Sequence, residues 1–220
     1  MRVQGVPLLG SQGKNVLKEK ILITFIFVQC VFCIKLNNEL ILFTNALMYG
    51  MHAVTYRYLK EKKPYVRVVL ADPEGSSLFH RVKHGVCYTA QQAEKVVKKH
   101  RHDSIVEGVG LDRITSNFQL ASINDAEKIS DQEIIDTAHW LLREEGLFVG
   151  SSSAMNVAAA CRVAMSMPEN SLIVTIICDN GQRHLSRFWN PDYIQKYNLS
   201  WPPKDVVPES MRFSCPTILT

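Results

Sequence analysis

The segment that decides the fold is SSSAMNVAAACRVAMSMPENSLIVTIICDNG, residues 151–181. Its first part begins within the three serines and runs to Pro168, and its many alanines predict a helix that packs very closely against a neighbour. Its second part, Ser171 to Cys178, is a short uncharged run typical of a strand buried on both faces of a parallel sheet. Together they predict an α/β fold, with a mostly parallel sheet flanked by helices. Ligands of such sheets bind beyond the carboxyl ends of the strands, which directs attention to residues 179–181 and to the helix start.

The sequence on the N-terminal side of this segment repeats the pattern. Ser130 and Glu133 have the spacing of a capping box, and they predict the start of a helix that ends at Gly146. We expect its apolar face to comprise Ile134, Ile135, Ala138, Leu141 and Leu142. Further upstream, residues 66–71 (VRVVLA) predict a second buried strand.

Composition excludes some classes of protein. The chain has 220 residues, of which 46% are apolar and 21% charged, as in ordinary globular proteins. The net charge of +4 is too small to require a nucleic-acid partner, and the basic run at residues 95–102 lacks interleaved aromatic residues, so we expect a solvated face there. The six cysteines are scattered, which predicts reduced thiols, and the Cys30–Cys33 pair lacks the context of a redox motif.

The first fifty residues differ from the rest, and we place a boundary near residue 53. Residues 21–34 form an uncharged run of 14 residues, and a second apolar stretch covers residues 40–51. A bilayer-spanning helix needs about 20 apolar residues, so this run is short for a membrane segment. Two alternatives stay open: membrane association through residues 21–51, or a buried strand or helix.

One candidate metal site consists of His80, His84 and Cys87, which recur at a helical spacing. Gly85 interrupts that helix, and isolated matches of this kind are usually fortuitous. We therefore assign no metal ligand.

Six segments, in this order, resemble the C-terminal half of the cysteine synthase / cystathionine β-synthase family. They are RYLKEKKP (57–64), VVLADPEGSSL (68–78), RVKHGV (81–86), IVEGVGLDRITSNF (105–118), REEGLFVGSSSAMNVAAA (143–160) and IICDNGQRHLSRFWNPDYIQKY (176–197). The resemblance implies part of a fold-type II pyridoxal-phosphate enzyme, of the tryptophan-synthase-β-like fold, in residues 54–200. Residues 1–53 are then a divergent segment and residues 201–220 a tail. The segments are most similar to fungal cysteine-synthase-like proteins, some of them mitochondrial.

The resemblance implies a cofactor site, with pyridoxal 5'-phosphate as the cofactor. Asn180 occupies the position at which we expect a family serine to bond the pyridine nitrogen, and its neutral amide can also donate a hydrogen bond. Gly108 and Gly110, in the EGVG segment, match a loop that lines the mouth of the family's active site, where backbone must approach the substrate. The implied substrate is a small amino acid.

The resemblance also implies parts that this sequence does not match. The family's Schiff-base lysine and carboxylate-binding loop lie in the N-terminal half, and Lys14 has the wrong spacing to replace that lysine. NALMYGMHAV (45–54) stands where a glycine-rich phosphate loop belongs, and its bulky side chains suit that task poorly. We assign no catalytic residue. One expectation is a cysteine-synthase-like β-replacement enzyme, incomplete or inactive in this chain. The other is a non-catalytic truncated remnant, associated with a membrane. By resemblance we expect a homodimer, and a cytoplasmic or mitochondrial location.

Overall fold

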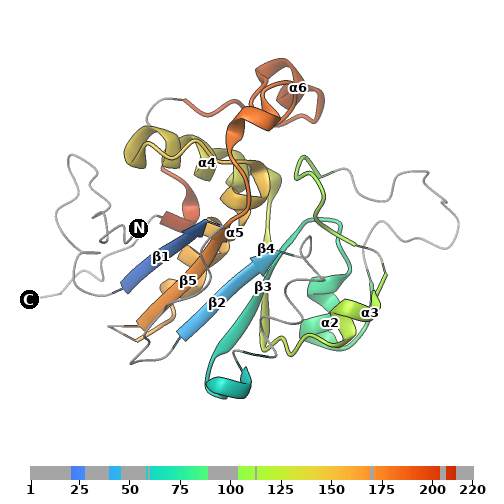
Figure 1. Cartoon of the computed structure of the whole chain (residues 1–220). Helices are drawn as coiled ribbons and strands as arrows, with labels where there is room; N and C mark the ends of the chain where they lie inside the picture. Colours follow the sequence, from blue (N-terminus) through green and yellow to red (C-terminus); the bar gives the residue numbers. More distant parts are fainter. Residues whose placement is uncertain are drawn as a thin grey trace, which may run out of the picture.

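A parallel sheet forms the centre of the molecule. The computed structural model describes residues 21–27, 40–45, 58, 60–88, 104–111, 113–168, 171–203 and 207–211. The sheet contains β1 (Ile21–Phe27), β2 (Leu40–Asn45), β3 (Arg67–Pro73), β4 (Asp125–Ile129) and β5 (Ser171–Ile177). The strand order is β1-β5-β2-β3-β4, and every pair is parallel (Figure 1). This sheet, with its helices, confirms the predicted fold class.

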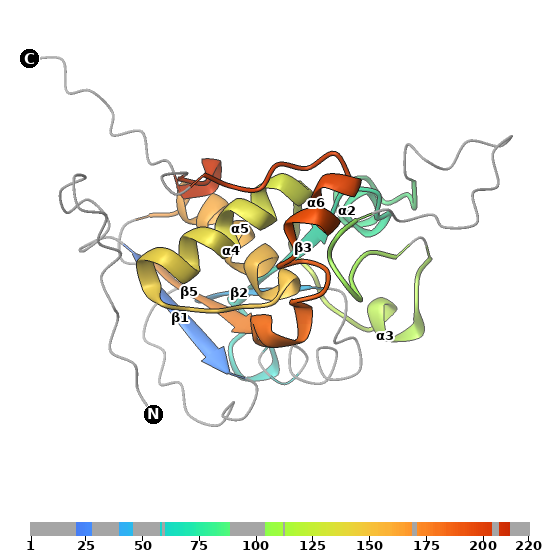
Figure 2. The same cartoon turned by 90° about the horizontal axis from the view of Figure 1, so that it is seen from above.

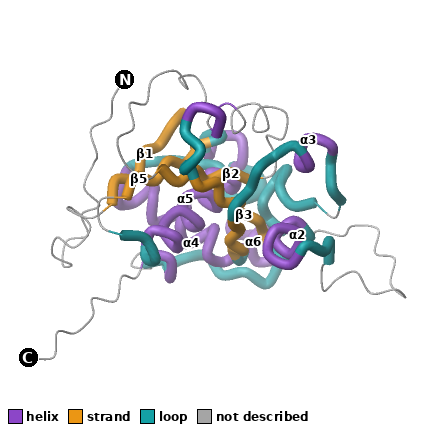
Figure 3. Tube along the Cα trace, turned by 90° about the horizontal axis from the view of Figure 1, so that it is seen from below, coloured by secondary structure: helices purple, strands orange, loops and turns teal. Residues whose placement is uncertain are grey.

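The helices of the described residues are α2 (Leu78–His84), α3 (Ser116–Gln119), α4 (Asp131–Glu145), α5 (Ser151–Ala164) and α6 (Pro191–Lys196), with short 3-10 helices at Gly181–His184 and Glu209–Met211. Among them, α2 packs on β3 and β4. The long helix α5 packs against β5, β2, β3 and β4, and α4 packs on α5 (Figure 2). Seen from below, α2 and α4 lie on the same side of the strands (Figure 3).

The composition of α5 explains its central position. Ala154, Ala158, Ala159 and Ala160 are fully buried, and such small side chains let the helix axis lie close to the sheet. Its one charged residue, Arg162, donates to both carboxylate oxygens of Glu133 in α4 and to the carbonyl of Lys128 at 2.9 Å. The Glu133 side chain is only 5% exposed, so this ion pair fixes α4 on α5 from within the protein.

The ends of α4 are those that the sequence predicts. Ser130 accepts a hydrogen bond from the backbone N–H of Glu133, and Gly146 ends the helix in the left-handed region at φ 68°. Four of the five residues expected on the buried face are fully buried, but Leu142 is 39% exposed. The expectation for Leu142 is wrong because its neighbour Leu141 already occupies the centre of that face.

The start of α5 also differs from the prediction. Gly150 is the N-cap and the helix already begins at Ser151, whereas the sequence predicted a start within the three serines. The three serines lie inside the first turn, where their hydroxyls are available to the loops around it.

The apolar N-terminal runs contribute strands. Residues 21–27 pair with β5, and residues 40–45 pair with both β5 and β3. No helix in the part of the chain that the structure describes is long and apolar enough to cross a membrane. Lys14, Cys30, Cys33, residues 95–102 and most of residues 45–54 lie outside the described residues. The boundary near residue 53 remains a prediction.

Candidate functional site

The loop after β5 is held against the segment that leads into α5. Gly150 N–H donates to the Asp179 carbonyl at 3.2 Å, and Gly181 N–H donates to the Phe148 carbonyl at 3.0 Å. Both glycines are needed for this approach. A Cβ at residue 150 would lie 2.1 Å from Asp179 Oδ1, and one at residue 181 would lie 2.5 Å from the Phe148 ring. The carboxyl end of β5 and the start of α5 therefore meet backbone to backbone.

The serines of α5 bind the two loops that the sequence singled out. Ser153 Oγ accepts from the N–H groups of Cys178, at 2.9 Å, and Asp179, at 3.3 Å. Ser151 Oγ accepts from the N–H of Glu107 at 3.4 Å. The first turn of α5 thus joins the loop at residues 179–181 to the segment at residues 104–111.

The 104–111 segment is anchored at its first end by α4. Asp131 accepts from Ser104 Oγ at 2.7 Å and from Ile105 N–H at 3.0 Å. Burial raises the pKa of the Asp131 carboxyl above its ordinary value, while these two hydrogen bonds oppose that shift. Asp131 therefore fixes where the segment begins.

The other end of the segment is anchored by the start of α2. The Leu111 carbonyl accepts from the Ser77 N–H and from Ser77 Oγ, both at 2.9 Å. Leu111 N–H donates to Ser76 Oγ at 3.1 Å. Between the two anchors, Gly108 and Gly110 have φ values of 73° and 88°, which residues other than glycine rarely adopt. The backbone between them is therefore held in one conformation.

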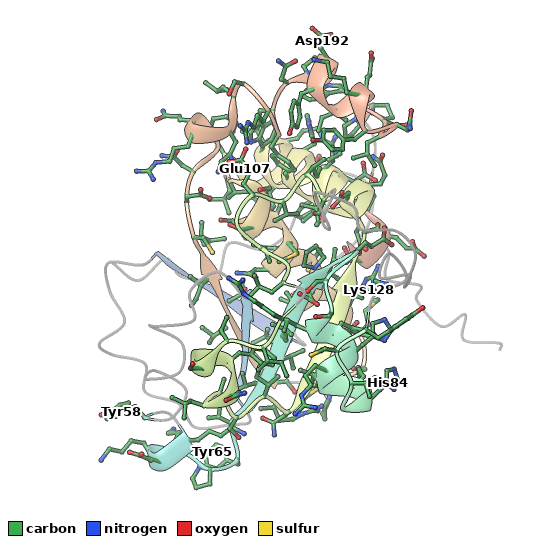
Figure 4. The ribbon with its side chains drawn as sticks, turned by 90° about the vertical axis from the view of Figure 1, so that its right-hand side faces the viewer. Tyr58, Tyr65, His84, Glu107, Lys128 and Asp192 are labelled. Carbon is green, nitrogen blue, oxygen red and sulfur yellow. The ribbon has the colours of Figure 1, made fainter. Side chains whose placement is uncertain are left out.

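A charged cluster spans the two loops. His184 Nε2 lies 2.7 Å from Asp179 Oδ2, and His184 Nδ1 lies 3.7 Å from Glu107 Oε2. Arg187 donates to Glu107 Oε1 at 3.2 Å. Figure 4 shows Glu107 in the half of the molecule that contains Asp192 of α6, and His84 in the other half.

The structure brings the predicted site segments together. Asn180 is exposed at the loop tip, and its Oδ1 accepts from Gln182 N–H at 3.2 Å, which leaves the amide nitrogen as the group able to donate to a ligand. Gly108 and Gly110 lie in the 104–111 segment, which is bonded to the start of α5 through Ser151. The roles of these three residues as cofactor contacts remain predictions.

The residues of the candidate metal site do not share a helical face. His80 and His84 are in α2, with ring centroids 5.6 Å apart, but Gly85 ends the helix in the left-handed region at φ 76°. Cys87 lies beyond that end and is exposed. Among the residues that the structure describes, no group of three or more His, Cys, Asp or Glu side chains is placed to hold a metal ion.

Sequence reasoning missed His184. It follows the loop by only a few residues, yet nothing in its spacing marks it, because its partner Glu107 is distant in sequence. The family segments quoted above contained both residues, but only the fold shows that they face each other.

The curated proteins that this chain resembles include several cysteine synthases. The chain is 44% identical over 144 residues to cysteine synthase 2 of Neurospora crassa, covering 64% of this chain and 32% of the relative. It is 43% identical over 152 residues to cysteine synthase 2 of Schizosaccharomyces pombe, covering 68% of this chain and 38% of the relative. A Saccharomyces cerevisiae relative, whose name includes the words mitochondrial cysteine synthase, is 46% identical over 136 residues, which cover 60% and 35%. The chain therefore spans about a third of the length of the curated relatives it matches.

Solved structures agree with these relatives. The O-acetylserine dependent cystathionine beta-synthase of Helicobacter pylori has a TM-score of 0.53 and 31% identity, over 68% of this chain and 42% of that one. An O-ureido-L-serine synthase has a TM-score of 0.54 over 69% of this chain and 42% of that one. Its sequence identity is 23%, so it supports the fold alone.

A family model described as pyridoxal-phosphate dependent enzyme matches residues 45–179. The described residues fit the ring end of this cofactor. The Asp179 carboxylate is engaged by His184, so the side chain presented at the exposed loop tip is the neutral amide of Asn180. A neutral donor suits a ring nitrogen that carries no proton. Because the family model covers more than half of its residues, the chain belongs to the pyridoxal-phosphate dependent enzymes.

Proposed function

We propose that this chain forms one side of the active site of a cysteine synthase. The reaction replaces the leaving group of an activated serine, such as O-acetylserine, with sulfide. The names of the relatives support this reaction, and so does the O-acetylserine-dependent structural neighbour. The observation that carries the proposal is the junction at the start of α5, where Ser151 and Ser153 hold the 104–111 segment and the loop at residues 179–181 together.

Each segment has a proposed role. The amide nitrogen of Asn180 donates to the pyridine nitrogen, and the backbone at Gly108 and Gly110 lies close to the substrate because no side chain intervenes there. When bound, pyridoxal phosphate would withdraw electrons from the α-carbon of the substrate, which neighbours the carbon that carries the leaving group. A neutral partner for the ring nitrogen suits β-replacement, because it does not require a protonated ring.

Location and assembly are part of the same proposal. The name of the yeast relative supports a mitochondrial location, and a cytoplasmic one is the alternative. We further propose a homodimer. Fractionation of the cells that produce this protein tests the first point, and analytical ultracentrifugation of the purified protein tests the second.

Cofactor binding is the decisive experiment. Purified protein is titrated with pyridoxal phosphate, and binding is measured by equilibrium dialysis and by absorbance. Borohydride reduction with peptide mapping then identifies any lysine that carries the cofactor. The protein is finally assayed for cysteine formation from O-acetylserine and sulfide. Binding with cysteine formation supports the proposal. Binding without turnover leaves a non-catalytic cofactor-binding protein, and absence of binding at saturating cofactor overturns the proposal.

Variants at the loop test the ring contact. We expect Asn180→Ala to weaken cofactor binding by roughly five-fold, the effect of about one hydrogen bond. Asn180→Ser should bind at least as tightly as the wild type, because serine is both a donor and an acceptor. Gln182→Ala is the matched control, because its side chain is exposed on the same loop. If Asn180→Ala binds normally, the assignment is wrong. Ser152→Ala then tests whether the hydroxyl of Ser152, which is buried in the first turn of α5, is the cofactor contact instead.

A further inference from the structure

His184 occupies a buried position between two carboxylates that come from distant parts of the chain. It is 7% exposed and lies in the 3-10 helix that follows the loop after β5. Since a carboxylate only accepts, the 2.7 Å contact with Asp179 places a hydrogen on His184 Nε2. Nδ1 faces Glu107 Oε2 at 3.7 Å, which is too long for a direct hydrogen bond and short enough for an ion pair when the ring is protonated.

We propose that His184 is a positioning residue, whose imidazole, with hydrogen on both ring nitrogens, pairs with Asp179 and Glu107 and so holds the 104–111 segment against the loop after β5. In this role it sets the separation of the two segments between which substrate and cofactor would lie, a consequence that rests on the proposed function. The clamp itself is a property of the chain and can be measured without cofactor.

The surroundings of His184 are built for this contact. A Cβ at residue 150 would lie 2.8 Å from His184 Nε2 and 2.1 Å from Asp179 Oδ1, so only glycine leaves room for the pair beside α5. Trp189 N–H donates to the His184 carbonyl at 3.0 Å, which fixes the backbone behind the ring. Glu107 is held on its far side by Arg187, and its own N–H is bound by Ser151.

Amide replacements separate the two halves of the clamp. The side-chain nitrogen of glutamine reaches about as far as Nε2, so His184→Gln keeps the donor toward Asp179 and removes the group facing Glu107. The shorter asparagine places its nitrogen near Nδ1, so His184→Asn does the reverse. A residue that merely filled space would respond to neither difference.

Hydrogen exchange of the cofactor-free protein, read by mass spectrometry, is the test. We expect His184→Ala to raise exchange about five-fold or more in peptides covering residues 104–111 and 179–184, because each loses about one hydrogen bond or ion pair. His184→Gln should raise it at residues 104–111 only, and His184→Asn at residues 179–184 only. Peptides from α4 serve as the internal reference.

Two arginines provide a matched pair on the surface. Arg187 and Arg183 are both exposed in the same stretch, and of the two only Arg187 contacts Glu107 in the described part of the chain. Arg187→Ala should raise exchange at residues 104–111 about two-fold, and Arg183→Ala should leave it unchanged. This pair tests the second contact that holds Glu107, and His184→Gln tests the clamp itself even if His184→Ala does not fold.

The outcomes separate the clamp from the function. Unchanged exchange at residues 104–111 in His184→Ala, or in His184→Gln if the first variant is unfolded, overturns the clamp. If the clamp is present and the wild type binds pyridoxal phosphate, His184→Gln should weaken that binding more than Arg183→Ala does. If the wild type binds no cofactor, the proposed function fails while the exchange result stands.

Discussion

Asp72 is the buried group with the clearest consequence for stability. It lies near the end of β3, is fully buried, and its Oδ2 accepts from the N–H of Phe79 at 2.7 Å. Its other oxygen, Oδ1, is buried without a hydrogen-bond partner among the described residues. Burial raises the pKa of Asp72 from 3.8 to about 7, and Ser76, Phe79 and Lys128 oppose that shift only in part. The folded protein therefore keeps a proton that the unfolded chain releases.

The sign and size of the effect follow from this difference. Between pH 3.8 and about 7 the folded state binds one more proton than the unfolded state, so the free energy of unfolding falls as the pH rises. The slope is about 1.4 kcal/mol per pH unit, and the whole shift corresponds to at most about 4 kcal/mol. An asparagine side chain cannot ionise, and its carbonyl oxygen can still accept from Phe79. The free energy of unfolding of Asp72→Asn, relative to that of the wild type, should therefore rise by roughly 2 kcal/mol between pH 5 and pH 7.

Urea unfolding of both proteins at pH 5, 6, 7 and 8 measures this difference. Taking variant minus wild type at each pH cancels every other titrating group. Asp192→Asn is the control for the substitution itself, because Asp192 is exposed in the first turn of α6. If the Asp72→Asn difference is flat across these pH values, then Asp72 is ionised in the folded protein and the reasoning from burial is wrong.

Three further predictions concern packing and charge. Burial, and to a lesser degree Arg143, lowers the pKa of His139 to about 4, so the folded protein favours the neutral imidazole. The stability that comes from this preference is complete above pH 6.5 and is lost as the pH falls toward 4. His139→Gln should melt with a weaker dependence on pH between 7 and 5, and an unchanged dependence would contradict the assignment. Arg162→Met leaves the Glu133 carboxylate buried and unpaired, and should lower the free energy of unfolding by about 3–5 kcal/mol. Adding Glu133→Gln should restore part of that loss in urea unfolding, and strictly additive losses would show that the two side chains do not act as a pair. Gly150→Ala should cost about 1–3 kcal/mol, because its Cβ must displace Asp179 and His184. An unchanged melting temperature would mean that the segment containing Asp179 and His184 can move aside at no cost, and would contradict this prediction.

Local patterns in the sequence were sufficient for individual elements. The cap at Ser130, the stop at Gly146 and the buried strand at Ser171 are confirmed, because each depends on residues within a few positions of one another. The alanines of α5 likewise predict close packing without saying what the partner is. Asn180, Gly108 and Gly110 came from family resemblance, and their contacts with cofactor remain to be tested.

Other features depended on packing between distant segments. The uncharged run at residues 21–34 left a strand, a helix and a membrane segment open, and only the pairing of β1 with β5 shows a strand at residues 21–27. The exposure of Leu142 and the helix start at Gly150 also follow from what lies alongside.

The sequence by itself determined individual elements, such as the helix between Ser130 and Gly146 and the buried strand that begins at Ser171, and the family that the chain resembles. Tertiary structure decided which of them touch, and it alone placed His184 between Asp179 and Glu107. The physical reason is range: hydrogen bonding within a helix and alternation along a strand act between near neighbours. Contacts across a site depend on how whole elements pack, and no local pattern encodes them.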